Sequence, residues 1–119
     1  MNYYLVKMVY RIICGDGVHT PQFDEQLRLI HAASTEEAFD KAALTGEAEA
    51  ETFFNQKEQL VQWKFINVSE IYQLTGLVHG AELYSQIREV DDAEAYITFV
   101  HHKASNLKFS EQTYQPATH

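Results

Sequence analysis

The sequence has little cysteine and little positive charge, and each shortage excludes a class of protein. Cys14 is the only cysteine among 119 residues, so a disulfide framework, a CxxC redox pair and a cysteine-rich zinc site are all excluded. Nine basic residues face 17 acidic ones, for a net charge of −8. No basic patch is present to bind a phosphate backbone, so we expect no nucleic-acid partner. A basic protein or a neutral ligand suits this charge better.

Long hydrophobic runs are also missing. The first fourteen residues are largely apolar, but Lys7 and Arg11 interrupt them. They lack a basic start and a cleavage site of small residues, so we expect no signal peptide. No run approaches the roughly 18 apolar residues of a membrane span. We therefore expect a cytoplasmic protein with no membrane partner.

The chain nevertheless has enough apolar residues to fold. Hydrophobic residues make up 45% of it and aromatic residues 13%, which argues against disorder. At this length one core is normal, and two cores would each be marginal. We expect a single domain over residues 1–104 and a polar tail over residues 105–119.

The hydrophobic periodicity predicts an α+β fold with elements in the order ββαββα. The predicted strands are 3–14, 23–33, 60–74 and 81–90, and the predicted helices are 35–54 and 92–104. The first and third strands are apolar on both faces and should be central, whereas the other two should be edges. A right-handed crossover then predicts an antiparallel sheet of order 2-1-3-4 with helix on one face.

Three local details follow from the same pattern. Pairing the apolar faces of the first two strands places Met8 opposite Leu29 and Tyr10 opposite Leu27. The third strand is long enough to predict a bulge near Asn67. The turn between the first two strands is expected at Gly15-Asp16-Gly17, which is not a phosphate-binding loop because no helix follows it.

The first helix has a clear start and one ambiguous glycine. Ser34 and Glu37 form a capping box, and small residues recur at helical spacing after it. Gly46 costs about 1 kcal/mol relative to alanine inside a helix. It either breaks the helix or lets the backbone approach the sheet closely, and we favour one continuous helix.

Several segments resemble a known family. They are the aromatic start Tyr3-Tyr4, the helix start at residues 33–38, the segment from Asn55 through residues 61–68, and the tract at residues 80–85. Together they are similar to a bacterial family described as domain of unknown function 4288, over roughly residues 3–87. That family often has tryptophan where this chain has Tyr3, and the region after Val90 lies outside its pattern. The resemblance implies a small stand-alone domain with no assigned activity and no recognised catalytic residues.

The residues that often carry chemistry are not arranged for it. His101 and His102 are adjacent, so on a helix they point about 100° apart rather than converging on a metal. The histidines at 19, 31 and 79 lie in separate segments without acidic partners at ligand spacing. Cys14 ends an apolar strand face, which favours a buried, inert thiol, although His19 could approach it. We expect no metal, no cofactor and no catalytic residues.

One pair of side chains remains of interest. Glu82 and Tyr84 are two apart on a predicted strand and would share a face. Together with Trp63, His79 and Arg88 they could line a polar pocket for a ligand or partner, where burial raises the pKa of a carboxyl group. The simpler interpretation is a solvated ion pair beside a tyrosine that covers the sheet. We favour it because no second catalytic carboxylate or nucleophile is evident.

Two functional hypotheses result. The first is a protein-interaction module, in the manner of an immunity protein or antitoxin that neutralises a basic partner. The alternative is a small-ligand-binding protein or an enzyme that uses the pocket around Glu82, Tyr84 and Trp63.

The sequence also predicts a homodimer. One helix can cover only one face of the sheet, so large apolar side chains would lie open on the other face. These are Leu5, Val9, Trp63 and Phe65. The second helix offers another cover for them through Tyr96, Ile97 and Val100.

Overall fold

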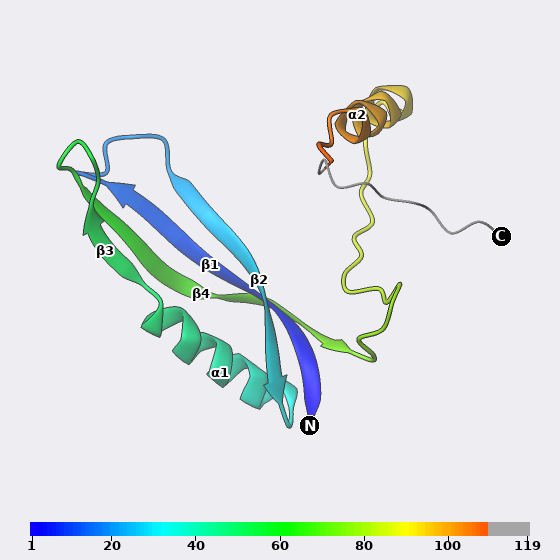
Figure 1. The fold of residues 1–119 in the computed structure, drawn as a ribbon, viewed down its shortest axis with the longest axis horizontal. Coiled ribbons are helices and arrows are strands. Elements are labelled where there is room, and N and C mark those ends of the chain that lie inside the picture. Colours follow the sequence, from blue (N-terminus) through cyan, green and yellow to red (C-terminus); the bar gives the residue numbers. More distant parts are fainter. Residues whose placement is uncertain (110–119) are drawn as a thin grey trace. The chain divides into compact units, whose positions relative to one another are not determined.

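The described part of the chain forms a four-stranded antiparallel sheet and two helices, which confirms the predicted α+β class. This structure is a computed structural model that describes residues 1–109. The strands are β1 (Asn2–Cys14), β2 (Gln22–Ala32), β3 (Glu51–Phe54) and β4 (Leu60–Leu74), and the helices are α1 (Thr35–Ala48) and α2 (Ala93–Ser105). The sheet order is β2-β1-β4-β3, with α1 on one face (Figure 1). The predicted order of the three long strands is thus correct.

The fourth place in the sheet is filled by a different segment from the predicted one. The helix expected to reach residue 54 ends at Ala48, and β3 follows at once. Thr52, Phe53 and Phe54 favour a strand. The turn after them leads into β4, the strand with which they pair. In this turn the Asn55 side chain accepts hydrogen bonds from the Lys57 and Gln59 backbone amides at 2.9 and 3.0 Å. β3 therefore pairs with the start of β4.

Residues 81–90 contain no regular secondary structure, so the predicted fourth strand is wrong. The alternation of apolar side chains there is real, but a strand forms only where a neighbouring strand takes up its hydrogen bonds. In the described residues no strand pairs with this segment.

The pairing of β1 with β2 differs from the prediction by three residues. Met8 lies opposite Gln26 and Tyr10 opposite Asp24, whereas Leu27 lies opposite Lys7. The cause is the connecting loop, where Asp16 accepts a hydrogen bond from the Val18 amide at 3.0 Å. A loop of this shape determines which residues meet, and a shift by an odd number reverses both faces of the strand. The leucines of β2 consequently point away from α1.

Two irregularities interrupt β4 and confirm the predicted bulge near Asn67. The register with β1 shifts between Lys7 and Met8 and again between Val9 and Tyr10. The shifts turn Phe65 toward α1, where it packs edge-on against Tyr10 with ring centroids 5.5 Å apart. Trp63 lies on the same side, since it is opposite Ile12.

The expectation that Trp63 and Phe65 lie on the open face is therefore wrong. Of the other two side chains expected there, Val9 is half-buried and Leu5 is buried. Leu5 lies between two large cross-strand neighbours, Leu29 and Tyr72.

The core lies between the even-numbered side chains of β1 and a row of small residues on α1. The buried helix residues are Ala38, Ala42 and Gly46, so the helix backbone approaches the sheet closely. Gly46 lies against the ring of Phe65. The glycine therefore lets the helix backbone approach the sheet closely and does not break the helix. The capping box is also confirmed, because the Glu37 amide donates to Ser34 at 3.1 Å and the Glu37 carboxylate accepts from the Ala33 amide.

The chain divides into two compact units, Met1–Ser85 and the residues from Gln86 on. In the second unit, α2 agrees with the predicted helix to within one residue, and the Asp92 side chain caps it by accepting from the Ala95 amide at 3.0 Å. No residue of α2 is buried, so the predicted inward positions Tyr96, Ile97 and Val100 are exposed. Much of the predicted tail, residues 110–119, lies outside the described residues.

Candidate functional site

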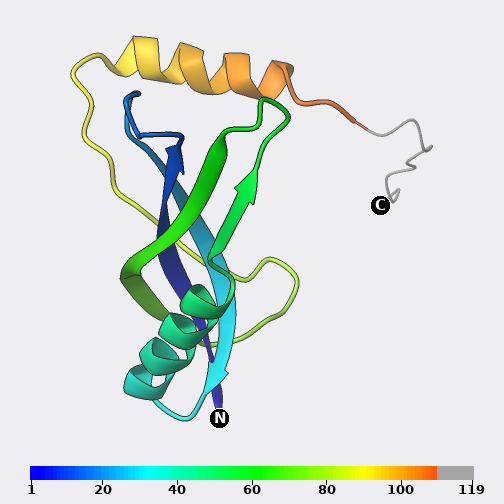
Figure 2. The same cartoon turned by 90° about the vertical axis from the view of Figure 1, so that its left-hand side faces the viewer.

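The sheet is much longer than the helix that covers it. α1 has 14 residues and spans about 21 Å, whereas β1 has 13 residues and spans about 43 Å. α1 lies against the half of the sheet that holds the start of β1 and the end of β2 (Figure 2). Beyond the C-terminal end of the helix, the same face forms an open hollow of about 570 Å³.

All four strands and the end of α1 contribute to this hollow. Its walls combine aromatic rings with charged and amide side chains. The lining residues are Tyr10, Asp24, Gln26, Arg28, Ala48, Glu49, Glu51, Phe53 and Trp63. Phe53 and Trp63 form a loose stack with ring centroids 6.5 Å apart.

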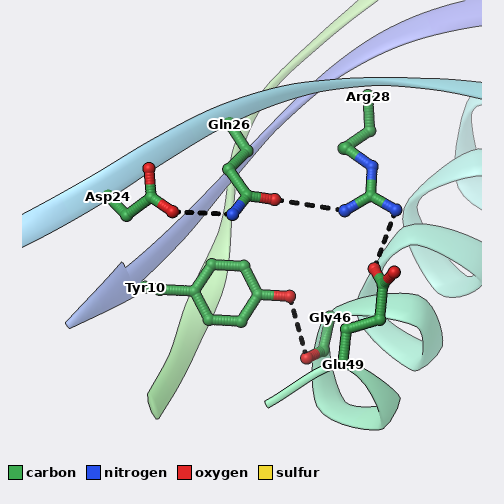
Figure 3. Close-up of polar contacts among 6 residues, drawn as sticks. All are labelled: Tyr10, Asp24, Gln26, Arg28, Gly46 and Glu49. Carbon is green, nitrogen blue, oxygen red and sulfur yellow. Dashed lines mark hydrogen bonds and ion pairs between the residues drawn. The ribbon is translucent and has the colours of Figure 1, made fainter. Parts of the chain in front are cut away.

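A continuous row of polar contacts crosses the hollow (Figure 3). Gln26 donates through Nε2 to Asp24 Oδ2 at 2.7 Å and accepts through Oε1 from Arg28 at 3.1 Å. Arg28 also pairs with Glu49 Oε2 at 2.8 Å. The Trp63 indole donates to the same Asp24 oxygen at 3.1 Å. These contacts hold the indole and the carboxylates in defined positions.

Negative charge dominates this end of the helix. Among the described residues that line the hollow, Asp24, Glu49 and Glu51 are acidic and Arg28 alone is basic. α1 has no basic residue in its last turn. The C-terminal end of a helix is itself partly negative. Tyr10 responds to this environment: burial, and then the charge of Glu49, raises the pKa of its hydroxyl.

The opposite face of the sheet, which we call the outer face, is exposed and apolar along β2. Phe23, Leu27 and Leu29 are 55%, 51% and 52% exposed. Next to them, Lys7 pairs with Glu70 at 2.8 Å, and the Tyr72 hydroxyl donates to Glu70 at 2.9 Å.

The five side chains proposed from the sequence do not gather at one place. Trp63 lines the hollow, whereas Tyr84 contacts the outer face, where its ring lies over Lys7 and meets Tyr72 edge-on at 5.5 Å. His79 and Glu82 are exposed in the segment that precedes Tyr84. Arg88 belongs to the second unit. Trp63 and Tyr84 thus lie on different faces of the sheet.

The sequence does not predict the polar residues of the hollow, because the alternation of apolar and polar residues along β2 alone assigns its polar side chains to solvent. Asp24, Gln26 and Arg28 are the polar positions of β2, and an edge strand with one polar face is ordinarily taken to expose that face. The helix predicted over residues 35–54 includes Glu49 as a helical residue. The available signal was the length of the strands, since one helix cannot cover 13-residue strands.

The turn near Cys14 holds His19 in a structural role. His19 accepts a hydrogen bond from the Cys14 backbone amide through Nε2 at 3.0 Å, and its Nδ1 lies 2.9 Å from the Thr20 carbonyl oxygen. His19 therefore approaches the backbone of Cys14 and closes the turn. Within residues 1–109 no three His, Cys, Asp or Glu side chains are grouped to hold a metal ion. No described helix is both long and apolar enough to span a membrane.

Comparison with known families agrees with the boundary between the two compact units. The family model "Domain of unknown function (DUF4288)" matches residues 3–85. The chain belongs to this family. The matched region coincides with the first compact unit, Met1–Ser85, so the DUF4288 domain is the sheet with α1. Its last residues, at the tract around Tyr84, contact the outer face. No curated protein and no solved structure matches the chain significantly.

Proposed function

We propose that this member of the DUF4288 family is a protein-interaction module that binds through the outer face of its sheet. The observation that carries the proposal is the exposed apolar row of β2, Phe23, Leu27 and Leu29. Leu27 and Leu29 are neighbours on this face, and Glu25 separates them from Phe23. Exposed apolar side chains grouped in this way often mark an interface. The row lies on a rigid strand paired along its length with β1, so it is presented without reorganisation.

The occupant that suits this face best is a second copy of the chain. The register places Lys7, Arg11 and Lys64 on it together with Glu25 and Glu70. A protein of net charge −8 repels its own copies over most of its surface, but here both signs are present. In a two-fold arrangement the same patch meets itself, so basic groups of one copy can lie near acidic groups of the other.

A basic protein is the second class of partner, and the hollow favours it. Asp24, Glu49 and Glu51 carry the negative charge there. Binding of a basic protein at the hollow leaves the outer face free, so self-association and partner binding are compatible. More specifically, we propose that the module neutralises its basic partner, as an immunity protein or an antitoxin does.

Light scattering at micromolar concentration tests the proposed dimer. We expect the wild-type chain, of 13.7 kDa, to have twice that mass. Leu27→Glu should give a monomer, because it places a charge in the apolar row. It should keep the fold, since Leu27 is half-exposed and lies opposite Lys7, where opposite charges across strands are favourable.

The matched control is Leu44→Glu, which places the same charge on an exposed leucine of α1 and should leave the dimer intact. Circular dichroism confirms folding of each variant, and Leu29→Glu replaces Leu27→Glu if the latter unfolds. A wild-type chain that remains monomeric, or a folded Leu27→Glu that dimerises as well as the control, contradicts the proposal.

A further inference from the structure

The hollow beyond α1 has walls of two kinds that together suit one class of ligand. Its aromatic side consists of Phe53 and Trp63, which both keep exposed surface, with the buried Tyr10 beside them. Its charged side consists of Asp24, Glu49 and Glu51. Aromatic faces attract cations through their ring electrons, and carboxylates attract them through charge and hydrogen bonds.

The contacts already made in the hollow leave capacity for a ligand. Gln26 and Trp63 both donate to Oδ2 of Asp24, and in the described chain no hydrogen bond reaches Oδ1. Figure 3 shows this second oxygen directed away from the polar row. Arg28 meanwhile pairs with Glu49, so the guanidinium group is engaged and the remaining charge of the hollow is negative.

We propose that this hollow binds a positively charged organic group, a guanidinium or ammonium, between Trp63 and the carboxylates of Asp24, Glu49 and Glu51. An anionic ligand would have to displace Glu49 from Arg28 and approach two further carboxylates. A neutral aromatic ligand would leave the carboxylates unused. The volume of about 570 Å³ is that of a small-molecule site and accommodates a whole arginine side chain. Because the outer face takes no part, this inference does not depend on the proposed dimer.

Trp63 reports directly on occupancy, since it is the only tryptophan in the chain. The probes are N-acetylarginine amide, a Gly-Arg-Gly peptide with blocked ends, and the same peptide with citrulline in place of arginine. Citrulline keeps the shape of arginine and removes its charge. We expect the two arginine probes to change Trp63 fluorescence saturably and the citrulline peptide to have no effect. Added salt should weaken binding, because the attraction is electrostatic.

Charge-removing variants test the carboxylates. Glu51→Gln should raise the Kd of the arginine peptide about three-fold, as expected for the loss of one solvent-exposed ion pair. Asp24→Asn combined with Glu51→Gln should raise it further. The matched control, Glu36→Gln, removes the same charge at the opposite end of α1 and should leave the Kd unchanged. Circular dichroism confirms that each variant is folded.

The two arginine probes distinguish the sources of the cation. Tighter binding of the peptide indicates a side chain on a partner protein, and equal binding indicates a small free amine or guanidine. Either result supports a cation site. A wild-type protein that shows no saturable change up to millimolar probe, or that responds equally to the citrulline peptide, overturns the inference. So does a Glu51→Gln response that equals the Glu36→Gln response.

Discussion

Replacing Gly46 with alanine should destabilise the domain, although glycine is a poor residue within a helix. On helix propensity alone, alanine would stabilise α1 by about 1 kcal/mol. A Cβ atom built on Gly46, however, would lie 2.4 Å from Cε1 of Phe65 and 2.7 Å from its Cζ, far inside van der Waals contact. The ring cannot turn away freely, because it is buried and packs edge-on against Tyr10.

The structure therefore has to move the helix outward or distort the ring. Forcing an extra methyl group into a packed core costs typically about 1 to 3 kcal/mol, and the contact of 2.4 Å places this site in the upper part of that range. A cost of about 2 to 3 kcal/mol leaves a net loss of about 1 to 2 kcal/mol after the propensity gain. For a domain of this size we expect the melting temperature to fall by roughly 5 to 15 °C. Urea denaturation followed by circular dichroism measures the free energy of unfolding directly.

A double-mutant cycle isolates the contact. Phe65→Val removes all three ring atoms that lie close to the added methyl group, at its own cost of roughly 2 to 3 kcal/mol for the cavity. In that background Gly46→Ala should be neutral or stabilising, so the sign of its effect is reversed. Gly46→Ala that stabilises the wild-type chain, or that has the same effect in both backgrounds, refutes the reasoning.

Two further predictions concern hydrogen bonds. Tyr10→Phe removes the bond from the buried Tyr10 hydroxyl to the Gly46 carbonyl, 3.1 Å long, and should lower the free energy of unfolding by about 1 kcal/mol; an unchanged urea midpoint contradicts this. Hydrogen bonds from Lys7 and Tyr72 lower the pKa of Glu70 below its usual 4.5. The stabilisation from Glu70 is therefore present above that value and is lost as pH falls through the lowered pKa. The difference in urea midpoint between the wild type and Glu70→Gln should accordingly shrink toward low pH; a difference that is constant with pH would show that this ion pair is not linked to folding.

Local chemistry explains what could be predicted from the sequence. The start of α1 follows from Ser34 and Glu37, since this cap involves residues three positions apart. The long strands follow from their β-branched and aromatic content, and the bulge in β4 from its length. All of these depend on neighbours in the chain.

What could not be predicted depends on contacts between distant segments. Residues 51–54 continue the helical spacing of α1, although Thr52, Phe53 and Phe54 also favour a strand. The pairing of this segment with β4 decides between the two. The tract around Tyr84 alternates like a strand, but no strand within residues 1–109 pairs with it. The side chains of the hollow could not be grouped because Asp24 and Trp63 meet only when the β1–β2 register and the shifts of β4 are both known.

The register of β2 links the fold to both proposals. A shift of one residue would turn Leu27 and Leu29 toward α1 and expose Asp24 and Arg28 to water, which is the arrangement expected of a monomer with a single buried face. In the observed register, Leu27 and Leu29 lie on the outer face, and Asp24 and Arg28 lie on the face of α1 and the hollow. This arrangement holds over the eleven residues of β2. It leaves half-exposed leucines on the outer face and places a row of polar groups in the hollow. Both placements are unfavourable in an isolated chain, since one exposes apolar surface and the other gathers three carboxylates around a single arginine. A second copy on the outer face and a cation in the hollow would each remove one of these costs, so the same register that looks poor for folding alone is suited to binding.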